Sequence, residues 1–247
     1  MLFQIISDIH IEKYSSEIKK HIKPSAENLI IAGDLGHLEY FDEYSKALKA
    51  ICQGFKKVIL VPGNHEYYVY HNIISMNSIN QKLKNLELKY KNLKVLINDF
   101  IYMGKYIIFG STFWSYCQKE NYNNPPIYSD KVDSEGKLLK ITQREYNILH
   151  LESVKIIENM IEYSEKNNKE LIIVTHYAPT FKGTLDKKYL NNPKNELYCS
   201  NNEHLIRNKI IKVWIYGHTG YNGIFEKLIT NQMEHKGLKD AVLTLYD

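Results

Sequence analysis

Several short apolar runs in this sequence are followed directly by side chains that can ligate a metal ion. Five runs end within three residues of an Asp, Asn or His, and these polar residues are Asp8, His10, Asp34, Asn64, His65, His176 and His218. Carboxylate, imidazole and carboxamide groups together suit Mn, Fe, Zn or similar ions better than Ca²⁺ or a thiolate site. Since ligands of open α/β sheets bind at the carboxyl ends of strands, we expect these residues to meet at one metal site.

Each of these residues also has an ordinary structural explanation when it is taken alone. Asp8 or Asp34 could cap a following helix, and Asn64 could be a turn residue. A single His176 or His218 is more often a hydrogen-bonded histidine than a ligand. One shared metal site accounts for all of them at once, and we therefore favour it.

The apolar runs themselves predict buried strands. They are short, rich in Ile and Val, and do not alternate with polar residues, which is typical of strands covered on both faces. The predicted strands are Leu2–Ile6, Leu29–Ala32, Val58–Val61, Ile107–Phe109, Leu171–Val174, Val213–Tyr216 and Ala241–Leu245.

Between most of these strands lie segments with helical spacing of apolar residues, namely Phe41–Phe55, Ile73–Tyr90 and Ile141–Tyr163. Strands that alternate with helices indicate an α/β domain. A hairpin is predicted from Asn98 to Phe109 with its turn at Gly104-Lys105, and a second hairpin or meander over Tyr221–Leu245, so the sheet is not purely parallel. The polar segment Thr112–Gly136 is predicted to be a long surface loop.

The motifs and their order resemble those of the calcineurin-like metallophosphoesterase superfamily. They are Asp8-Ile9-His10, Gly33-Asp34, Gly63-Asn64-His65-Glu66, Thr175-His176 and Gly217-His218. The resemblance extends over essentially the whole chain and implies one domain of residues 1–247. It also implies a four-layer α/β/β/α sandwich, in which two mixed β-sheets are flanked by helices.

The resemblance further implies a phosphoester hydrolase, either a phosphatase or a phosphodiesterase, with two divalent metal ions. Asp8 and His10 would hold the first ion, Asp34 would bridge, and Asn64, His176 and His218 would hold the second. Two such ions, about 3.5–4 Å apart, would clamp a phosphoester and ionise a bridging water to hydroxide. His65 would act as the general acid for the leaving group. Mn²⁺ is the first choice of metal, with Fe, Zn, Ni or Co as alternatives.

One position departs from the pattern of the enzymes that the chain resembles. Their last motif is GHxH, whereas this chain has Gly217-His218-Thr219-Gly220, so glycine replaces a ligand of the first ion. We expect weaker binding of that ion and reduced activity. The alternative hypothesis is a non-catalytic interaction module. Glu234 or His235 could compensate by reaching the site, although a solvated turn is the favoured interpretation of that segment.

The remaining candidate groups receive structural interpretations. His37, three residues after Asp34, is expected to be an exposed loop histidine, and His21, His71, His150 and His204 are expected on the surface or on helices. Glu66 could orient His65. Four aromatic residues of the loop Thr112–Gly136 could stack on a substrate ring, but a loop packed on the core is favoured; they are Trp114, Tyr116, Tyr122 and Tyr128.

Composition excludes several other classes of protein. The chain has 247 residues and a net charge of +4, but its lysines are scattered, so a nucleic-acid partner is only weakly supported compared with a phosphorylated small molecule or nucleotide. No apolar run is long enough to span a membrane, and the first residues do not form a signal peptide. Three cysteines without a CxxC motif are typical of reduced thiols, so a cytoplasmic location is expected. The sequence does not indicate the oligomeric state.

Overall fold

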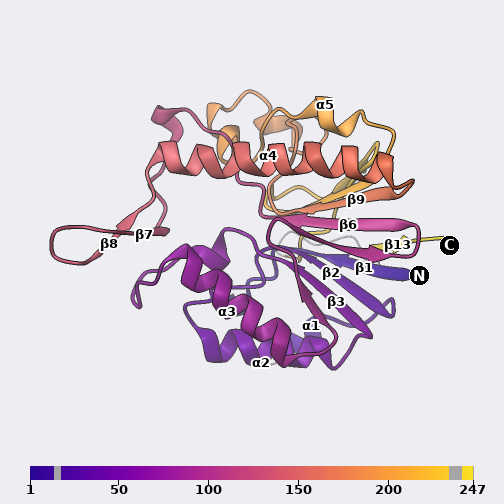
Figure 1. Cartoon of the computed structure of the whole chain (residues 1–247), viewed down its shortest axis with the longest axis horizontal. Coiled ribbons are helices and arrows are strands. Elements are labelled where there is room, and N and C mark those ends of the chain that lie inside the picture. Colours follow the sequence, from indigo (N-terminus) through magenta and orange to yellow (C-terminus); the bar gives the residue numbers. More distant parts are fainter. Residues whose placement is uncertain (14–17, 234–240, 247) are drawn as a thin grey trace.

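The molecule consists of two large mixed β-sheets packed face to face, with helices on their outer sides (Figure 1). The computed structural model describes residues 1–13, 18–233 and 241–246. The predicted four-layer α/β/β/α sandwich is therefore confirmed. Within the described residues, no helix is both long and apolar enough to cross a membrane.

The first sheet has the strand order β13-β1-β2-β3-β4. Its strands β1 to β4 are parallel, and β13 pairs with β1 in the antiparallel direction. The strands are β1 (Leu2–Ile6), β2 (Asn28–Ala32), β3 (Lys57–Val61), β4 (Leu93–Val95) and β13 (Val242–Thr244).

The second sheet has the order β11-β12-β10-β9-β6-β5. Its four inner strands are parallel, and the two edge strands β5 and β11 are antiparallel to their neighbours. The strands are β5 (Asp99–Met103), β6 (Tyr106–Ser111), β9 (Glu170–Thr175), β10 (Ile211–Tyr216), β11 (Gly223–Phe225) and β12 (Leu228–Thr230).

Helices cover the outer face of each sheet, with α2 and α3 under the first sheet and α4 over the second (Figure 1). The α-helices are α1 (Ile18–His21), α2 (Phe41–Cys52), α3 (Met76–Lys89), α4 (Gln143–Lys166) and α5 (Glu203–Ile206). The 3₁₀ helices are η1 (Ile11–Lys13), η2 (His65–Tyr67), η3 (Lys119–Asn121), η4 (Lys187–Tyr189) and η5 (Pro193–Leu197).

The layered packing explains why the strands are apolar throughout. In β2, Leu29 and Ile31 pack against the helical layer, whereas Ile30 and Ala32 point into the core between the two sheets. Strand β9 does the same on the other side of that core, where Ile172 contributes to the inter-sheet cluster. A strand buried on both faces has no solvent side on which polar residues could alternate.

Helix ends follow capping chemistry more closely than apolar spacing. The helix predicted from Ile73 begins only at Met76, because the Ser75 hydroxyl accepts from Ser78 N and caps it. Helix α4 begins after Thr142, which forms a capping box with Glu145. The helices predicted over Phe41–Phe55 and Ile141–Tyr163 end at Cys52 and Lys166.

The predicted surface loop Thr112–Gly136 is more ordered than expected. It contains η3 and strand β7 (Tyr128–Val132), which pairs with β8 (Leu138–Lys140) in a separate two-stranded sheet. Trp114 is buried and its ring lies 5.4 to 5.7 Å from the rings of Tyr67, Tyr146 and Tyr177. This part of the segment packs on the core, which is the interpretation that the sequence favoured.

Both predicted hairpins are present. Strands β5 and β6 are joined at Gly104-Lys105, and β11 and β12 form the hairpin near the end of the chain. The predicted last strand is shortened to Val242–Thr244 and pairs with β1, so it joins the first sheet.

A buried carboxylate joins the loops that follow β2 and β3. One oxygen of Glu66 accepts hydrogen bonds from Gly63 N at 2.6 Å and Asp34 N at 3.1 Å. The other accepts from Leu35 N at 2.8 Å, from Gly36 N at 3.4 Å and from the Tyr44 hydroxyl at 3.1 Å. Glu66 therefore fixes the relative position of the two loops, and the suggestion that it orients His65 is not supported by these contacts.

Replacing Glu66 by Gln is expected to lower the free energy of unfolding by about 2–4 kcal/mol. The amide group of Gln must face backbone N–H donors whichever way it is oriented, because both oxygens of Glu66 accept at least two hydrogen bonds. Urea denaturation measures the loss. Tyr44→Phe is the matched control, since it removes one donor and should cost about 1 kcal/mol. Equal losses in the two variants would contradict this role of Glu66.

His150 lies on α4 as expected, but its side chain is buried and hydrogen-bonded through Nδ1 to the carbonyl of Trp114. Burial lowers the pKa of His150 to about 4 from 6.5. Between these values the unfolded chain binds more protons, so the free energy of unfolding decreases as the pH falls.

Substitution of His150 by Asn is expected to make the protein less sensitive to acid, because Asn keeps a donor for the Trp114 carbonyl and does not titrate. Between about pH 7.5 and about pH 5, the wild type should lose about 2 kcal/mol more than His150→Asn. Urea denaturation of both proteins at the two pH values tests this. Parallel pH dependences would show that His150 does not contribute.

Candidate metal centre

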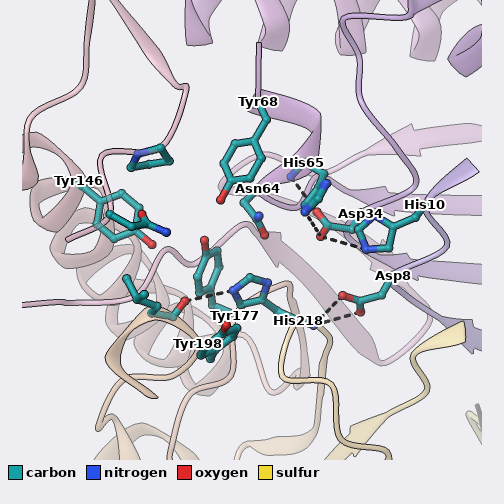
Figure 2. Close-up of a pocket in the computed structure, with 13 residues that line it drawn as sticks. Asp8, His10, Asp34, Asn64, His65, Tyr68, Tyr146, Tyr177, Tyr198 and His218 are labelled. Carbon is teal, nitrogen blue, oxygen red and sulfur yellow. Dashed lines mark hydrogen bonds and ion pairs between the residues drawn. The ribbon is translucent and has the colours of Figure 1, made fainter. Parts of the chain in front are cut away.

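The strands that precede the candidate residues end at one place in the molecule. Strands β1, β2 and β3 are adjacent and parallel, as are β9 and β10, and the two sets come from facing sheets. Figure 2 shows side chains from the loops after these strands pointing into a common space. The structure brings together all seven candidate residues, Asp8, His10, Asp34, Asn64, His65, His176 and His218.

The backbone turns sharply at this junction. Asp8, His10, Asp34 and His218 have φ angles of 50°, 49°, 54° and 68°, in the left-handed region that non-glycine residues rarely adopt. Such residues cluster at functional sites, where the surrounding structure holds them in place. Close approach is also required next to Asp34, since a Cβ on Gly63 would lie 2.2 Å from Asp34 Oδ1.

Asp34 lies at the centre of the cluster and is buried. Its Oδ2 is 3.1 Å from His176 Nε2, 3.8 Å from His10 Nε2 and 3.9 Å from His65 Nε2. Its Oδ1 accepts a hydrogen bond from the backbone N–H of His65 at 2.9 Å. One carboxylate thus contacts side chains from both sheets.

Hydrogen bonds fix which nitrogen of each histidine faces inward. The Nδ1 of His176 donates to the Ala32 carbonyl at 2.9 Å, so its Nε2 is left with a lone pair. The Nδ1 of His10 donates to the Glu12 carboxylate at 3.1 Å, which also leaves Nε2. The Nε2 of His218 donates to the Leu197 carbonyl at 3.1 Å and leaves Nδ1. Such outer hydrogen bonds are typical of metal-binding histidines.

The inward-facing atoms repel one another unless a positive charge lies between them. His176 Nε2 is 2.9 Å from Asn64 Oδ1 and 3.1 Å from Asp34 Oδ2. Burial alone would lower the pKa of His176, but the charges of Asp34 and Asp8 outweigh it and raise the pKa to about 9. Without a metal ion, a second proton on His176 Nε2 would be stabilised at the central position. The nitrogen and oxygen donors at this position suit a divalent cation such as Mn²⁺ or Zn²⁺.

Asp8 is held in place by its neighbours. Its carboxylate accepts from the Ser7 hydroxyl at 2.5 Å and from the His218 N–H at 3.0 Å. Burial, together with the nearby charge of Asp34, raises its pKa. A carboxylate that is destabilised in this way gains from a neighbouring cation.

The possible ligand atoms fall into three groups, of which two share Asp34. These two are Asp8, Asp34, His176 and His218, and His10, Asp34 and His65; the third is Glu12, His37 and His65. The atoms within each group lie no more than 4.8 Å apart. A carboxylate common to the first two groups is the arrangement that a bridged pair of ions requires.

Gly220 contributes no side chain to this cluster. Its φ angle is 67°, and its N–H donates to the buried Gln232 side chain at 2.7 Å. The same Gln232 side chain also binds Thr219 and Tyr221, so it fixes the turn after His218. Glu234 and His235, which could have replaced the missing ligand, lie outside the described residues.

The expectation that His37 is an exposed loop histidine is wrong. Its side chain is only 12% exposed, and its Nε2 lies 3.1 Å from His65 Nδ1. His37 follows Asp34 by three residues and therefore lies on the same loop, and this spacing is the sequence signal that places it near the cluster. The sequence could not indicate which way the ring turns.

A cavity of about 270 Å³ opens beside the cluster. Four tyrosines form much of its wall, and the close-up in Figure 2 shows their rings around the cavity; they are Tyr68, Tyr146, Tyr177 and Tyr198. The His218 ring packs between Tyr177 and Tyr198, with ring centroids 4.2 and 5.1 Å away. No sequence motif predicts this wall, because the tyrosines come from separate parts of the chain.

Comparison with known proteins agrees with this geometry. The family model of calcineurin-like phosphoesterases matches residues 1–221. A curated protein of Acanthamoeba polyphaga mimivirus, uncharacterized protein L509, is 33% identical over 224 residues, covering 83% of this chain and 77% of that protein.

Two solved structures share the fold at low sequence identity. The phosphopantetheinyl hydrolase PptH of Mycobacterium tuberculosis has a TM-score of 0.65 and 18% identity, covering 92% of this chain and 86% of its own. A dimetal phosphatase from Danio rerio has a TM-score of 0.51 and 13% identity, covering 94% and 87%. The match of the family model to residues 1–221 shows that this chain belongs to the calcineurin-like phosphoesterase family.

Proposed function

We propose that this protein hydrolyses phosphoesters with two bound divalent ions, of which Mn²⁺ is the first choice. Asp8 and His10 would hold one ion and Asn64, His176 and His218 the other, with Asp34 shared between them. This division is the one that the family resemblance implies, and it differs from the observed grouping at Asp8, whose carboxylate lies with His176 and His218. The substrate would be a phosphorylated small molecule or a nucleotide.

One observation carries this proposal, namely the shared orientation of three histidine rings. Each donates one ring N–H to a carbonyl or carboxylate outside the cluster, so its other nitrogen faces the cluster. Family membership supports the same chemistry.

The ions, when bound, would withdraw charge from the phosphoryl oxygens and lower the pKa of the attacking water. The side chains of this protein would position the ligands and transfer the proton. Glu12 and the carbonyls of Ala32 and Leu197 orient the three ligand histidines. Because these acceptors already hold the three rings, the ligand nitrogens need little rearrangement during the reaction, which is how an enzyme stabilises developing charge at low reorganisation cost.

We assign protonation of the leaving group to His65. Its Nε2 lies at 3.9 Å from Asp34 Oδ2 and its side chain is 29% exposed, so the ring borders both the cluster and the cavity. A leaving-group oxygen in the cavity would be within reach of that nitrogen. The proton would pass from Nε2 of the His65 imidazolium to the oxygen as the P–O bond breaks, leaving a neutral imidazole.

The cavity wall supports a compact substrate. Tyrosine rings and Pro125 provide flat apolar surfaces, and the Tyr68 hydroxyl and Asn123 add polar groups. A ring such as a nucleobase or an aromatic alcohol would pack well against such surfaces.

Substitution of Asp34 by Asn is expected to reduce hydrolysis of an aryl phosphate by at least about 100-fold in the presence of Mn²⁺. The substitution removes the charge that both groups of ligands share. Elemental analysis of Mn²⁺-loaded protein should find about two ions per wild-type chain and fewer in the variant. Asp186→Asn, at an exposed carboxylate, is the control and should behave as the wild type.

A folded wild-type protein that binds less than about one ion per chain and shows no turnover would contradict the proposal. That result would favour the non-catalytic interaction module suggested by Gly220. Circular dichroism must show that the protein tested is folded.

His65→Ala is expected to slow hydrolysis of a phenyl phosphoester by about 100-fold or more and that of a 2,4-dinitrophenyl phosphoester much less. The second leaving group departs without protonation. Metal content should not change, because His65 is assigned to proton transfer. Equal rate losses for the two substrates would rule out the role as general acid.

A further inference from the structure

One short stretch of the chain connects the cavity wall, an expected metal ligand and a neighbouring loop. It consists of Glu196, Leu197 and Tyr198, at the end of η5, and we call it the 196–198 segment. The Leu197 carbonyl accepts a hydrogen bond from His218 Nε2 at 3.1 Å. The Tyr198 ring packs on the same histidine, with ring centroids 5.1 Å apart and ring planes inclined by 34°. Leu197 and Tyr198 both line the cavity, so one segment holds the ligand and forms part of the wall.

Tyr198 presents part of its aromatic ring to an incoming molecule. Of the two tyrosines that pack on His218, Tyr177 is 3% exposed, whereas Tyr198 is 39% exposed. Figure 2 shows Tyr198 directly beside His218. An exposed aromatic surface gains free energy when another flat ring packs on it. A ring that packs on Tyr198 must therefore lie close to the metal centre.

Glu196 connects this segment to a loop that forms another part of the wall. Its Oε2 accepts hydrogen bonds from Gln118 N and from Asn121 Nδ2, each at 2.9 Å. Asn123 and Pro125 follow in the same loop and line the cavity. Because both hydrogen bonds end on one oxygen, Glu196 fixes the position of that loop relative to the 196–198 segment.

We propose that the 196–198 segment selects phosphoesters that carry a flat aromatic ring next to the phosphoryl group, as aryl phosphates do. Tyr198 packs on the ring of the substrate, and Glu196 is a positioning residue that holds Tyr198 relative to Asn123 and Pro125. The cavity volume of about 270 Å³ lies just below the usual range of about 300–1,000 Å³ for ligand sites, which suits a single ring. The inference rests on the proposed function, because that function places the phosphoryl group beside His218.

The first measurement compares two ligands that cannot be hydrolysed. Phenylphosphonate and cyclohexylphosphonate share an anionic head and a six-membered ring, but only the first ring is flat and aromatic. Isothermal titration calorimetry of the Mn²⁺-loaded full chain should show that phenylphosphonate binds about 3–10-fold more tightly. Inorganic phosphate has no ring and reports binding to the metal centre alone.

Variants of the 196–198 segment then locate the origin of this preference. Tyr198→Leu should abolish it, whereas Tyr198→Phe should keep it because phenylalanine retains the ring. Glu196→Ala should weaken phenylphosphonate binding about 3-fold or more, whereas Glu196→Gln should bind nearly as the wild type, since one amide oxygen can accept both hydrogen bonds. Phosphate affinity and Mn²⁺ content should stay at the wild-type level in all four variants. Tyr189→Leu, at an exposed tyrosine of η4, is the matched control and should bind all three ligands as the wild type does.

Equal affinities of the wild type for the two phosphonates, or an unchanged preference in Tyr198→Leu, would overturn the proposal. A parallel loss of phosphate and phenylphosphonate affinity in Glu196→Ala would also contradict it, since it would show a general disturbance of the metal centre. Thermal unfolding establishes that each variant is folded. A wild type that prefers phenylphosphonate but hydrolyses no phosphoester would refute the proposed function and leave this selectivity standing. Turnover with equal phosphonate affinities would do the reverse.

Discussion

The site depends on three lone pairs that face one another in a buried space. They belong to Asp34 Oδ2, Asn64 Oδ1 and His176 Nε2, and the nitrogen lies about 3 Å from each of the two oxygens. In a low-dielectric interior such an arrangement is unfavourable unless a cation or a proton separates the atoms. The fold nevertheless forms this arrangement of atoms. The packing of the two sheets fixes strands β2, β3 and β9 with their ends close together, whether or not a cation is bound.

Two glutamates that do not line the cavity hold the residues of the cluster in defined positions. Glu66 gathers the backbone N–H groups of the loops after β2 and β3, which places Asp34 and Asn64 relative to each other. Glu12 accepts a hydrogen bond from His10 Nδ1 and lies 3.6 Å from His37 Nε2. Both carboxylates act through hydrogen bonds to neighbours, so the positions of the inward-facing atoms depend on residues that never meet a substrate.

Much of the fold and of the inner cluster could be predicted from the sequence because their signals are local. Each candidate ligand follows an apolar strand closely, so the same stretch of about ten residues predicts both the strand and the ligand at its end. The orientation of His37, the hydrogen bonds of Glu66 and the tyrosine wall could not be predicted in this way. Tyr146 comes from α4 and Tyr198 from the segment after η5, and only tertiary packing brings them to the same cavity.

Position 220 shows how backbone geometry and ligand chemistry compete. Gly220 has a φ angle of 67°, a conformation that glycine adopts freely and that costs a histidine about 1–2 kcal/mol. Asp8, His10, Asp34 and His218 all tolerate similar angles, so the site holds several conformations that the isolated chain would avoid. A glycine at residue 220 therefore offers no metal ligand, but it adopts the turn after β10 with less backbone strain than a histidine would. The packing of the fold then has less strain to offset.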